Sequence, residues 1–281
     1  MLWKGGRRSS NVEDRRGRGG MGMGMAGGGI GLLILVVLGL LFGINPGDLM
    51  QGGETGPLPP QQTAPSASEQ APPPDEMGQF VSVVLGSTED AWNEKFSQAG
   101  RDYPEPRLVL FSGMVQSACG MAGSAVGPFY CPRDGSVYID LNFYRDLRER
   151  FGADGDFAQA YVIAHEVGHH VQNVLGVMER MQPGTTGEGS TAVRVELQAD
   201  CLAGVWGHHA RQRNLLEEGD FEEAMNAASA IGDDRIQQKT QGQVVPESFT
   251  HGSSEQRQRW FRRGFESGDL KQCDTFASGT L

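Results

Sequence analysis

Apolar and polar positions divide the chain into two contrasting parts. Residues 26–44 carry no charge and are almost wholly apolar, whereas residues 45–76 are rich in Pro, Gln, Gly and Ser. The second composition cannot bury enough apolar surface to fold, so it predicts an extended linker. From residue 77 onward, apolar residues recur at helical spacing or gather in short runs, which predicts one folded domain at 77–281.

The folded part contains both helix and strand patterns. An apolar helical stretch begins at Gln79, and residues 87–90 have the composition of a second helix start. Two runs rich in β-branched and aromatic residues predict strands, with a Gly-rich loop between them. Further helices are expected at 156–176, 190–206 and 255–261, the strands at 107–111 and 136–141, and the loop at 113–135.

Residues 26–44 predict a single transmembrane helix. A spanning helix needs about 20 apolar residues, and this segment is near the lower limit. A cleaved signal peptide would have a shorter apolar core followed by a small-x-small cleavage site, but Asn45-Pro46-Gly47-Asp48 follows here. A buried core helix would be amphipathic, and this one is not. We therefore expect a membrane anchor.

The distribution of charge orients this anchor and excludes one class of partner. Residues 1–25 hold six basic and two acidic residues, so the net charge of −11 leaves −15 on the remainder. A basic flank before the anchor predicts a cytoplasmic N-terminus at 1–25, single-pass insertion in the plasma (inner) membrane, and a periplasmic or other extracytoplasmic domain. The acidic body is unsuited to nucleic acid, which requires a basic surface.

Four cysteines lie beyond the anchor, on the side expected to be oxidising. An even number there predicts disulfides, with three possible connectivities. We favour Cys119–Cys131, which would close the Gly-rich loop, and Cys201–Cys273, which would tie the tail to a helix. The alternative is four free thiols packed as small apolar groups.

The helix expected at 156–176 carries His165-Glu166-Val167-Gly168-His169. His165 and His169 are one turn apart and share a helix face, so both imidazoles can bind one zinc ion. Glu166 lies beside them and can act as general base toward a metal-activated water. The alternative interpretation is a helix with polar residues on its solvent face.

A catalytic zinc site needs a third protein ligand. The extended HExxHxxGxxH arrangement fails, because Gln172 and Leu175 occupy its last two positions. Glu196 and Asp200, four residues apart on the next helix, supply another arrangement. Glu196 can bind zinc, and Asp200 can accept the second ring N–H of a ligand histidine. Their apolar surroundings argue against an ordinary solvated face, since buried acids need partners.

His251 precedes the last predicted helix. Outside the metal ligands, it could stabilise the oxyanion of a tetrahedral intermediate. A histidine in a surface loop is the equally simple alternative.

Several segments together resemble the bacterial putative neutral zinc metallopeptidase family, and the likeness covers most of the chain. They are residues 7–17, 127–132, 165–172, 196–201 and 250–257. The family is similar to the gluzincin metallopeptidases. This resemblance implies an α+β fold, a mostly helical zincin-like domain with a small sheet. It also implies an edge strand that holds an extended substrate, for which Val137–Leu141 is the candidate.

The expected function is therefore zinc-dependent hydrolysis of peptide bonds in a peptide or protein substrate, with one Zn²⁺ per chain. One rival is a zinc-binding envelope protein with a structural or scaffolding role and no turnover; the intact Glu166 argues against it. The other rival is a metal-free envelope protein that binds a partner through its acidic surface. The Glu196 and Asp200 pair argues against that possibility.

Overall fold

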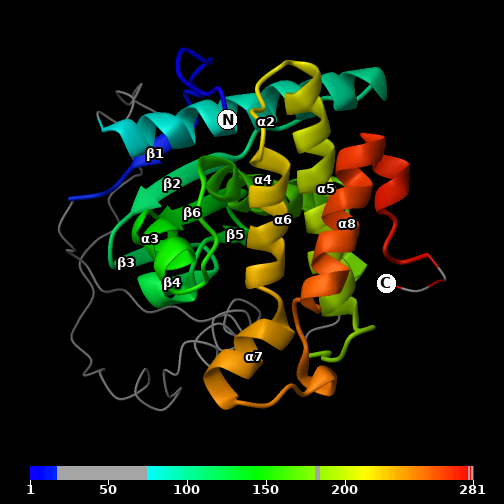
Figure 1. Cartoon of the computed structure of the whole chain (residues 1–281). Helices are drawn as coiled ribbons and strands as arrows, with labels where there is room; N and C mark the ends of the chain where they lie inside the picture. Colours follow the sequence, from blue (N-terminus) through cyan, green and yellow to red (C-terminus); the bar gives the residue numbers. More distant parts are fainter. Residues whose placement is uncertain (18–74, 181–183, 278, 280) are drawn as a thin grey trace, which may run out of the picture.

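The computed structural model of the chain describes residues 1–17, 75–180, 184–277, 279 and 281. These residues form a mostly helical α+β fold, in which helices pack beside a small sheet (Figure 1). The helices are α2 (Glu76–Gln98), α3 (Asn142–Glu149), α4 (Asp156–Val174), α5 (Thr191–Gln212), α6 (Asp220–Ala230), α7 (Asp233–Gln241) and α8 (Ser254–Ser267). The strands are β1 (Val12–Asp14), β2 (Arg107–Phe111), β3 (Met114–Ser117), β4 (Gly120–Gly123), β5 (Phe129–Cys131) and β6 (Ser136–Asp140).

The transmembrane helix expected at 26–44 lies outside the described residues, as does nearly all of the linker expected at 45–76. Within the described ranges, no helix combines the length and the apolar character needed to cross a membrane. The first helix of the domain starts at Glu76, close to the predicted boundary at residue 77.

The main sheet has the strand order β1-β2-β6-β5. The strands β1, β2 and β6 are parallel, and β5 runs antiparallel to β6. The two strands predicted from the sequence are confirmed as β2 and β6. The prediction that Val137–Leu141 forms a substrate-binding edge is wrong, because β6 lies between two partners and all its residues are buried. The β-branched and aromatic run indicated burial, and the edge strand on this side of the sheet is β5.

The Gly-rich segment at 113–135 is more ordered than predicted. It contains the antiparallel hairpin β3–β4 as well as β5, and Cys119–Cys131 joins the hairpin to β5. Gly120 and Gly127 have φ angles of +127° and +79°, which only glycine adopts readily. Strands of three or four residues are too short to show an alternating pattern of apolar and polar residues. The many glycines of this segment therefore predicted a loop.

A single helix, α2, replaces the two helical pieces expected near residues 79 and 87. Its N-cap is Asp75, whose side chain accepts a hydrogen bond from the Gly78 amide. Thr88 lies inside the helix, where its hydroxyl donates to the Leu85 carbonyl. The polar run at 87–90 therefore contributes buried side chains within one helix and does not mark a helix start.

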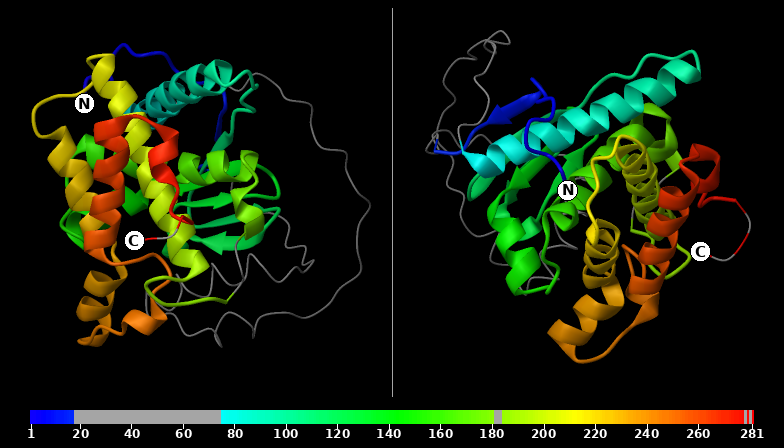
Figure 2. Two further views of the ribbon diagram at one scale, coloured as in Figure 1. Left: turned by 90° about the vertical axis from the view of Figure 1, so that its right-hand side faces the viewer. Right: turned by 45° about the horizontal axis from the view of Figure 1, so that its top comes forward.

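The first 17 residues pack against the domain, and β1 extends the sheet beside β2, next to α2 (Figure 2). The buried carboxylate of Glu89 accepts hydrogen bonds from Arg7, Ser9 and Asn11. This placement differs from the separate basic segment expected at 1–25, because a count of charges ignores that these arginines pair with acids of the domain. A single crossing at 26–44 would put the two on opposite sides of a membrane. Packing of residues 1–17 on the domain and a single membrane crossing at 26–44 therefore exclude each other within one molecule.

Close backbone contacts fix the helical part. At the crossing of α5 and α8, a Cβ on Gly204 would lie 2.1 Å from the Phe261 carbonyl oxygen, and one on Gly264 would lie 1.9 Å from the Cys201 carbonyl oxygen. Cys201 also forms the favoured disulfide with Cys273, which ties α5 to the C-terminal segment. Both favoured cysteine pairs are thus present in the structure.

The docking of residues 1–17 gives a testable change in stability. A Cβ on Gly86 of α2 would lie 2.6 Å from the Arg7 carbonyl oxygen. We expect Gly86→Ala to lower the free energy of unfolding of the full chain by about 1–3 kcal/mol through overpacking. In a chain lacking residues 1–17, the same change should raise it by about 0.5–1 kcal/mol, because alanine favours helix. Denaturant titration of both pairs measures this, and an equal effect in both chains would contradict the docking.

Candidate metal centre

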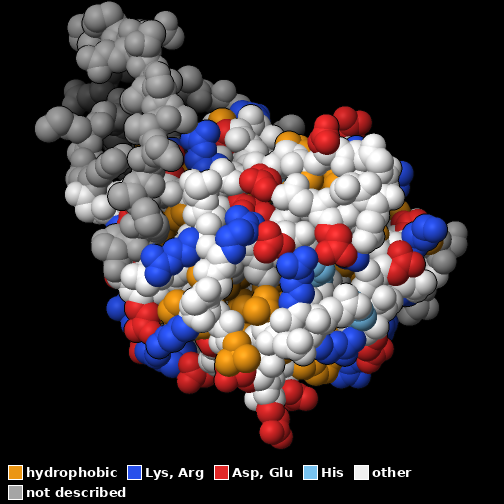
Figure 3. Space-filling view, turned by 90° about the horizontal axis from the view of Figure 1, so that it is seen from above, with side chains coloured by type: hydrophobic (Ala, Val, Ile, Leu, Met, Phe, Trp, Pro, Cys, Tyr) orange, Lys and Arg blue, Asp and Glu red, His pale blue; other side chains and the backbone are white. Residues whose placement is uncertain are grey.

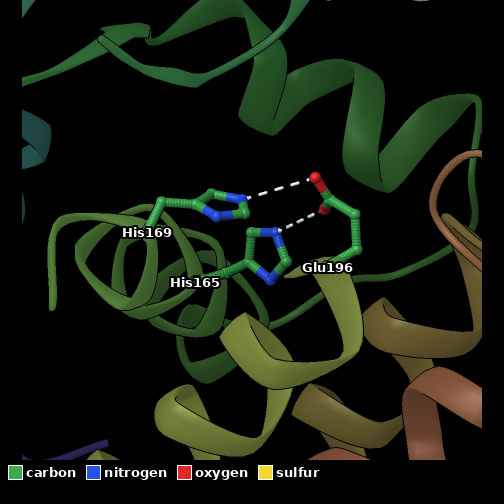
Figure 4. A group of neighbouring side chains, drawn as sticks. All are labelled: His165, His169 and Glu196. Carbon is green, nitrogen blue, oxygen red and sulfur yellow. Dashed lines mark hydrogen bonds and ion pairs between the residues drawn. The ribbon is translucent and has the colours of Figure 1, made fainter. Parts of the chain in front are cut away.

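Three side chains from two helices converge at one point. His165 and His169 project from α4 and Glu196 from α5, with one carboxylate oxygen facing each imidazole (Figure 4). Glu196 Oε2 is 3.2 Å from His165 Nε2, and Glu196 Oε1 is 3.6 Å from His169 Nε2. One ligand atom from each residue lies within 4.8 Å of the other two.

Gly168, inside the motif, allows the two helices to approach. A Cβ at this position would lie 3.0 Å from the Ala199 carbonyl oxygen and 3.2 Å from the Ala199 Cα atom of α5. Any larger side chain would push α5 away from α4. The glycine between the two histidines therefore helps to set the distance from the histidines to Glu196.

Hydrogen bonds at the Nδ1 atoms orient both imidazoles. His165 Nδ1 is 2.9 Å from Asp200 Oδ1, and His169 Nδ1 is 2.8 Å from Gln172 Oε1. The Gln172 amide is itself held by the Val195 carbonyl of α5, at 2.7 Å. With each Nδ1 proton engaged, both Nε2 lone pairs point toward Glu196 and are available as metal ligands.

These donors suit a zinc ion. Zinc bonds of about 2.0–2.1 Å in tetrahedral geometry would separate neighbouring ligand atoms by roughly 3.3 Å, close to the spacings seen here. Burial opposes protonation of His165, but Asp200 and Glu196 outweigh it and raise the pKa of the imidazole to about 9. The same excess of negative charge favours a divalent cation, whose binding would displace that proton.

A second cluster of metal-ligating groups lies away from this centre. Its members are Asp156, Asp220 and Glu223, and it contains no histidine or cysteine. The amino group of Met1 pairs with Asp156 and Asp220 in the structure. An all-carboxylate set is less suited to zinc than two imidazoles with one carboxylate.

Asp200 is the centre of a buried network behind the ligands. Arg257 of α8 donates to both of its oxygens, at 2.9 and 3.0 Å, and the Tyr161 hydroxyl donates at 2.5 Å. Burial opposes ionisation of Asp200, but Arg257 and His165 outweigh it and hold the pKa of the carboxyl below its ordinary value. Asp200 is therefore ionised and can hold the His165 N–H.

Glu166 is buried beside the ligands and lines the same cavity. Burial raises the pKa of its carboxyl, although His169 and His165 lower it in part. A carboxylate with a raised pKa is a stronger base than an exposed one, as proton abstraction near neutral pH requires.

His251 faces the same cavity from the segment before α8. Its Nδ1 atom is 3.1 Å from Asp233 Oδ1, while the other Asp233 oxygen accepts backbone N–H groups from Thr250, His251 and Gly252. Burial opposes protonation of His251, but Asp233 outweighs it and the pKa of the imidazole lies above its ordinary value. The expected surface-loop alternative does not match this anchored position.

The cavity has a volume of about 600 Å³, and the edge strand β5 forms one of its walls through Phe129 and Tyr130. His170, the neighbour of the ligand His169, faces away from the ligands and supports this wall. Its Nδ1 atom is 3.0 Å from the Tyr130 hydroxyl, and its Nε2 atom is 2.6 Å from the Pro104 carbonyl oxygen.

The structure brings together every residue assigned to the centre from the sequence. His165, Glu166, His169, Glu196 and His251 line one cavity, and Asp200 lies directly behind His165. Sequence reasoning missed the roles of Tyr161, Gln172, Asp233 and Arg257. Arg257 had a detectable signal, because it shares a helix face with Trp260 and Phe261 and a buried arginine requires an acidic partner.

Comparison with known proteins finds one matching family and several similar bacterial proteins. A family model described as "Putative neutral zinc metallopeptidase" matches residues 1–276. The uncharacterized protein YpfJ of Escherichia coli (strain K12) is 53% identical over 289 residues, which cover 98% of this chain and 99% of that protein. The uncharacterized protein Rv2575 of Mycobacterium tuberculosis is 45% identical over 217 residues, 73% of this chain and 74% of that protein. No solved structure gives a significant match.

The buried network around Asp200 predicts that substitutions on α8 lower the free energy of unfolding strongly only where they remove a partner of this carboxylate. Replacing Arg257 by Ala would leave the Asp200 charge buried without its strongest partner, and we expect a loss of about 3–5 kcal/mol in the free energy of unfolding. Arg262→Ala, at an exposed position of the same helix, should change it by less than about 0.5 kcal/mol. Denaturant titration compares the two variants. Similar values for both would show that the Asp200 and Arg257 pair is not critical.

Proposed function

The chain belongs to the putative neutral zinc metallopeptidase family, and on this premise we propose that it hydrolyses peptide bonds, using one zinc ion and Glu166 as general base. One observation carries the proposal: Glu166 is buried in the same cavity as three convergent ligand atoms of two histidines and one carboxylate. A purely structural zinc site would have no use for an additional carboxylate with a raised pKa.

His165, His169 and Glu196 would hold the metal ion. When bound, zinc supplies Lewis-acid activation of water and of a peptide carbonyl. Glu166 accepts the proton of the attacking water and later delivers it to the leaving amine. His251, held by Asp233, donates a hydrogen bond to the oxyanion that develops on the substrate carbonyl.

Asp200 and Gln172 contribute by position. Each fixes the Nδ1 atom of one ligand histidine, so neither ring can rotate when the substrate binds. Arg257 neutralises the remaining charge of Asp200, and none of the three needs to change its protonation during turnover. The chain thus places its rigid groups behind the ligands and its proton carriers inside the cavity.

A zinc-binding scaffold without turnover is the alternative function, and it shares every ligand with the peptidase. The two differ only in what Glu166 does, so turnover separates them. A metal-free protein that binds partners through an acidic surface has less support. On the face shown in Figure 3, basic side chains lie among the acidic ones.

We also propose that the domain acts outside the cytoplasm. Two disulfides join its segments, and disulfides persist in oxidising compartments. The membrane anchor at 26–44 and the cytoplasmic N-terminus stay predictions from the sequence, and both would require a state in which residues 1–17 do not pack on the domain.

Zinc content and hydrolysis, measured together, test the proposed activity. The wild-type chain should bind about one zinc ion and cleave casein or a quenched peptide. Glu166→Gln should keep the zinc but lower hydrolysis by about 10²–10⁴-fold, because the proton acceptor is lost. Glu196→Ala should lose most of the zinc, because it lacks one of the three protein ligands.

Elemental analysis and a fluorescence assay give the two readouts. Full turnover by Glu166→Gln would overturn the base assignment. Zinc without any hydrolysis by the wild type would favour the scaffold, and a folded, disulfide-bonded wild type without zinc would contradict both functions.

The pH dependence of hydrolysis tests His251. Its protonated form is the donor, so kcat/KM should fall as the pH rises through its pKa, which Asp233 raises. Asp233→Asn removes the raising charge and should move this alkaline limb to lower pH. The same profile for His251→Ala is the control, because that variant should have low activity and lack the limb. An unmoved limb in Asp233→Asn that still binds zinc would exclude His251 as the proton donor.

A further inference from the structure

The cavity extends beyond the metal ligands into an apolar region between the end of α3, α4 and the segment that leads into α7. Its wall includes Phe151, Val162, Ile231 and Ile236. Val162 precedes His165 by three residues and therefore shares its helix face, so the apolar wall begins within one turn of a metal ligand. The total volume of about 600 Å³ is ample for a large side chain beside the reacting bond.

Two basic side chains border this apolar region. Arg150 directly precedes Phe151, and Lys239 follows Ile236 by three residues on the same face of α7. The Lys239 ammonium donates a hydrogen bond to the Arg150 carbonyl oxygen, so the end of α3 and α7 meet here. Each of these two walls thus presents an apolar residue together with a basic one.

The chain as a whole is acidic, with 24 basic and 35 acidic residues and a net charge of −11. Arg150 forms an ion pair with Asp146 of α3 at 3.7 Å, and two more charged groups of the cavity are also engaged. Glu196 belongs to the metal ligands, and Arg257 is paired with Asp200. Lys239 lines the cavity and has a backbone carbonyl, not a carboxylate, as its hydrogen-bond partner in the described structure. A carboxylate on a bound molecule would complement this rim.

We propose that this region selects substrate segments in which a bulky apolar side chain lies next to an acidic group. The apolar side chain occupies the region lined by Phe151, Val162 and Ile236, and the carboxylate pairs with Lys239 at the rim. This inference rests on the proposed peptidase function and names the substrate class of the same site. The carboxylate belongs either to an Asp or Glu side chain or to the C-terminus of the peptide.

Binding of short peptides to the zinc-loaded Glu166→Gln chain tests this selection without turnover. Four labelled Ala-based peptides are compared by fluorescence anisotropy. Three have amidated C-termini and contain Phe-Glu, Phe-Gln or Ala-Glu; the fourth contains Phe-Gln and ends in a free carboxylate.

Phe-Glu should bind most tightly of the amidated peptides. Replacing Glu by Gln should weaken binding by about two- to fivefold, as for an exposed ion pair. Replacing Phe by Ala should weaken it by about tenfold or more, because less apolar surface is buried. If the free-carboxylate Phe-Gln peptide binds as tightly as amidated Phe-Glu, a terminal carboxylate is accepted as well as a side chain; if it binds only as tightly as amidated Phe-Gln, the side-chain carboxylate alone is recognised.

A charge reversal at the rim gives the matched test. Lys239→Glu, made in the same Glu166→Gln background, should reverse the preference, so that a fifth, amidated peptide containing Phe-Lys binds better than Phe-Glu. Arg235→Glu is the control, because Arg235 is exposed on the same helix and does not line the cavity. It should leave the order of the peptides unchanged. An unchanged order in Lys239→Glu, equal shifts in both variants, or no binding of any peptide would overturn the proposal.

Failure of this inference and failure of the proposed function give different results. Hydrolysis of a mixed peptide pool without enrichment for the apolar and acidic pair would overturn the inference and leave the peptidase intact. The expected peptide preference in a chain that binds zinc but never hydrolyses would support the inferred recognition and overturn the peptidase.

Discussion

A buried carboxylate, Asp200, joins the metal centre to the rest of the fold. It is fully enclosed, and its partners come from two other helices: Tyr161 and His165 from α4, and Arg257 from α8. A buried charge is costly unless its hydrogen bonds are complete, so the three helices are strongly held in the one arrangement that completes them. That same arrangement directs His165 Nε2 toward Glu196. Packing of the helical core and orientation of a metal ligand are therefore consequences of one interaction.

The remaining elements enclose the cavity next to this rigid centre. The disulfide-linked hairpin and β5 form one side of the cavity, and α3 and α7 form the other. Gly168 brings α4 close to α5 without filling that space, while Gly204 and Gly264 do the same for α5 and α8. The molecule thus combines closely packed backbones behind the ligands with an apolar cavity in front of them, as expected for a site that must hold both a metal ion and an extended chain.

The sequence was most informative where chemistry is set by spacing along one helix. His165 and His169 one turn apart, and Glu196 and Asp200 one turn apart, could be placed correctly because helical period alone decides which side chains share a face. Arg257 and Asp233 could not be assigned, since their roles depend on which helices meet in three dimensions. The edge strand was misplaced because a buried run such as Ser136–Asp140 does not reveal its number of neighbours. The packing of residues 1–17 on the domain could not be predicted, because composition does not show that Arg7 has a buried acidic partner.

The bond between Cys201 and Cys273 has a consequence for the order of events during biosynthesis. Cys201 follows Asp200 directly and lies five residues after Glu196, whereas its partner is 72 residues further along the chain. This crosslink cannot close until the ribosome has made residue 273 and the chain has met an oxidant. The helix that supplies the third ligand thus lacks its covalent restraint throughout nearly all of translation. Late closure therefore postpones the full restraint of this helix until translation is nearly complete and an oxidant is present.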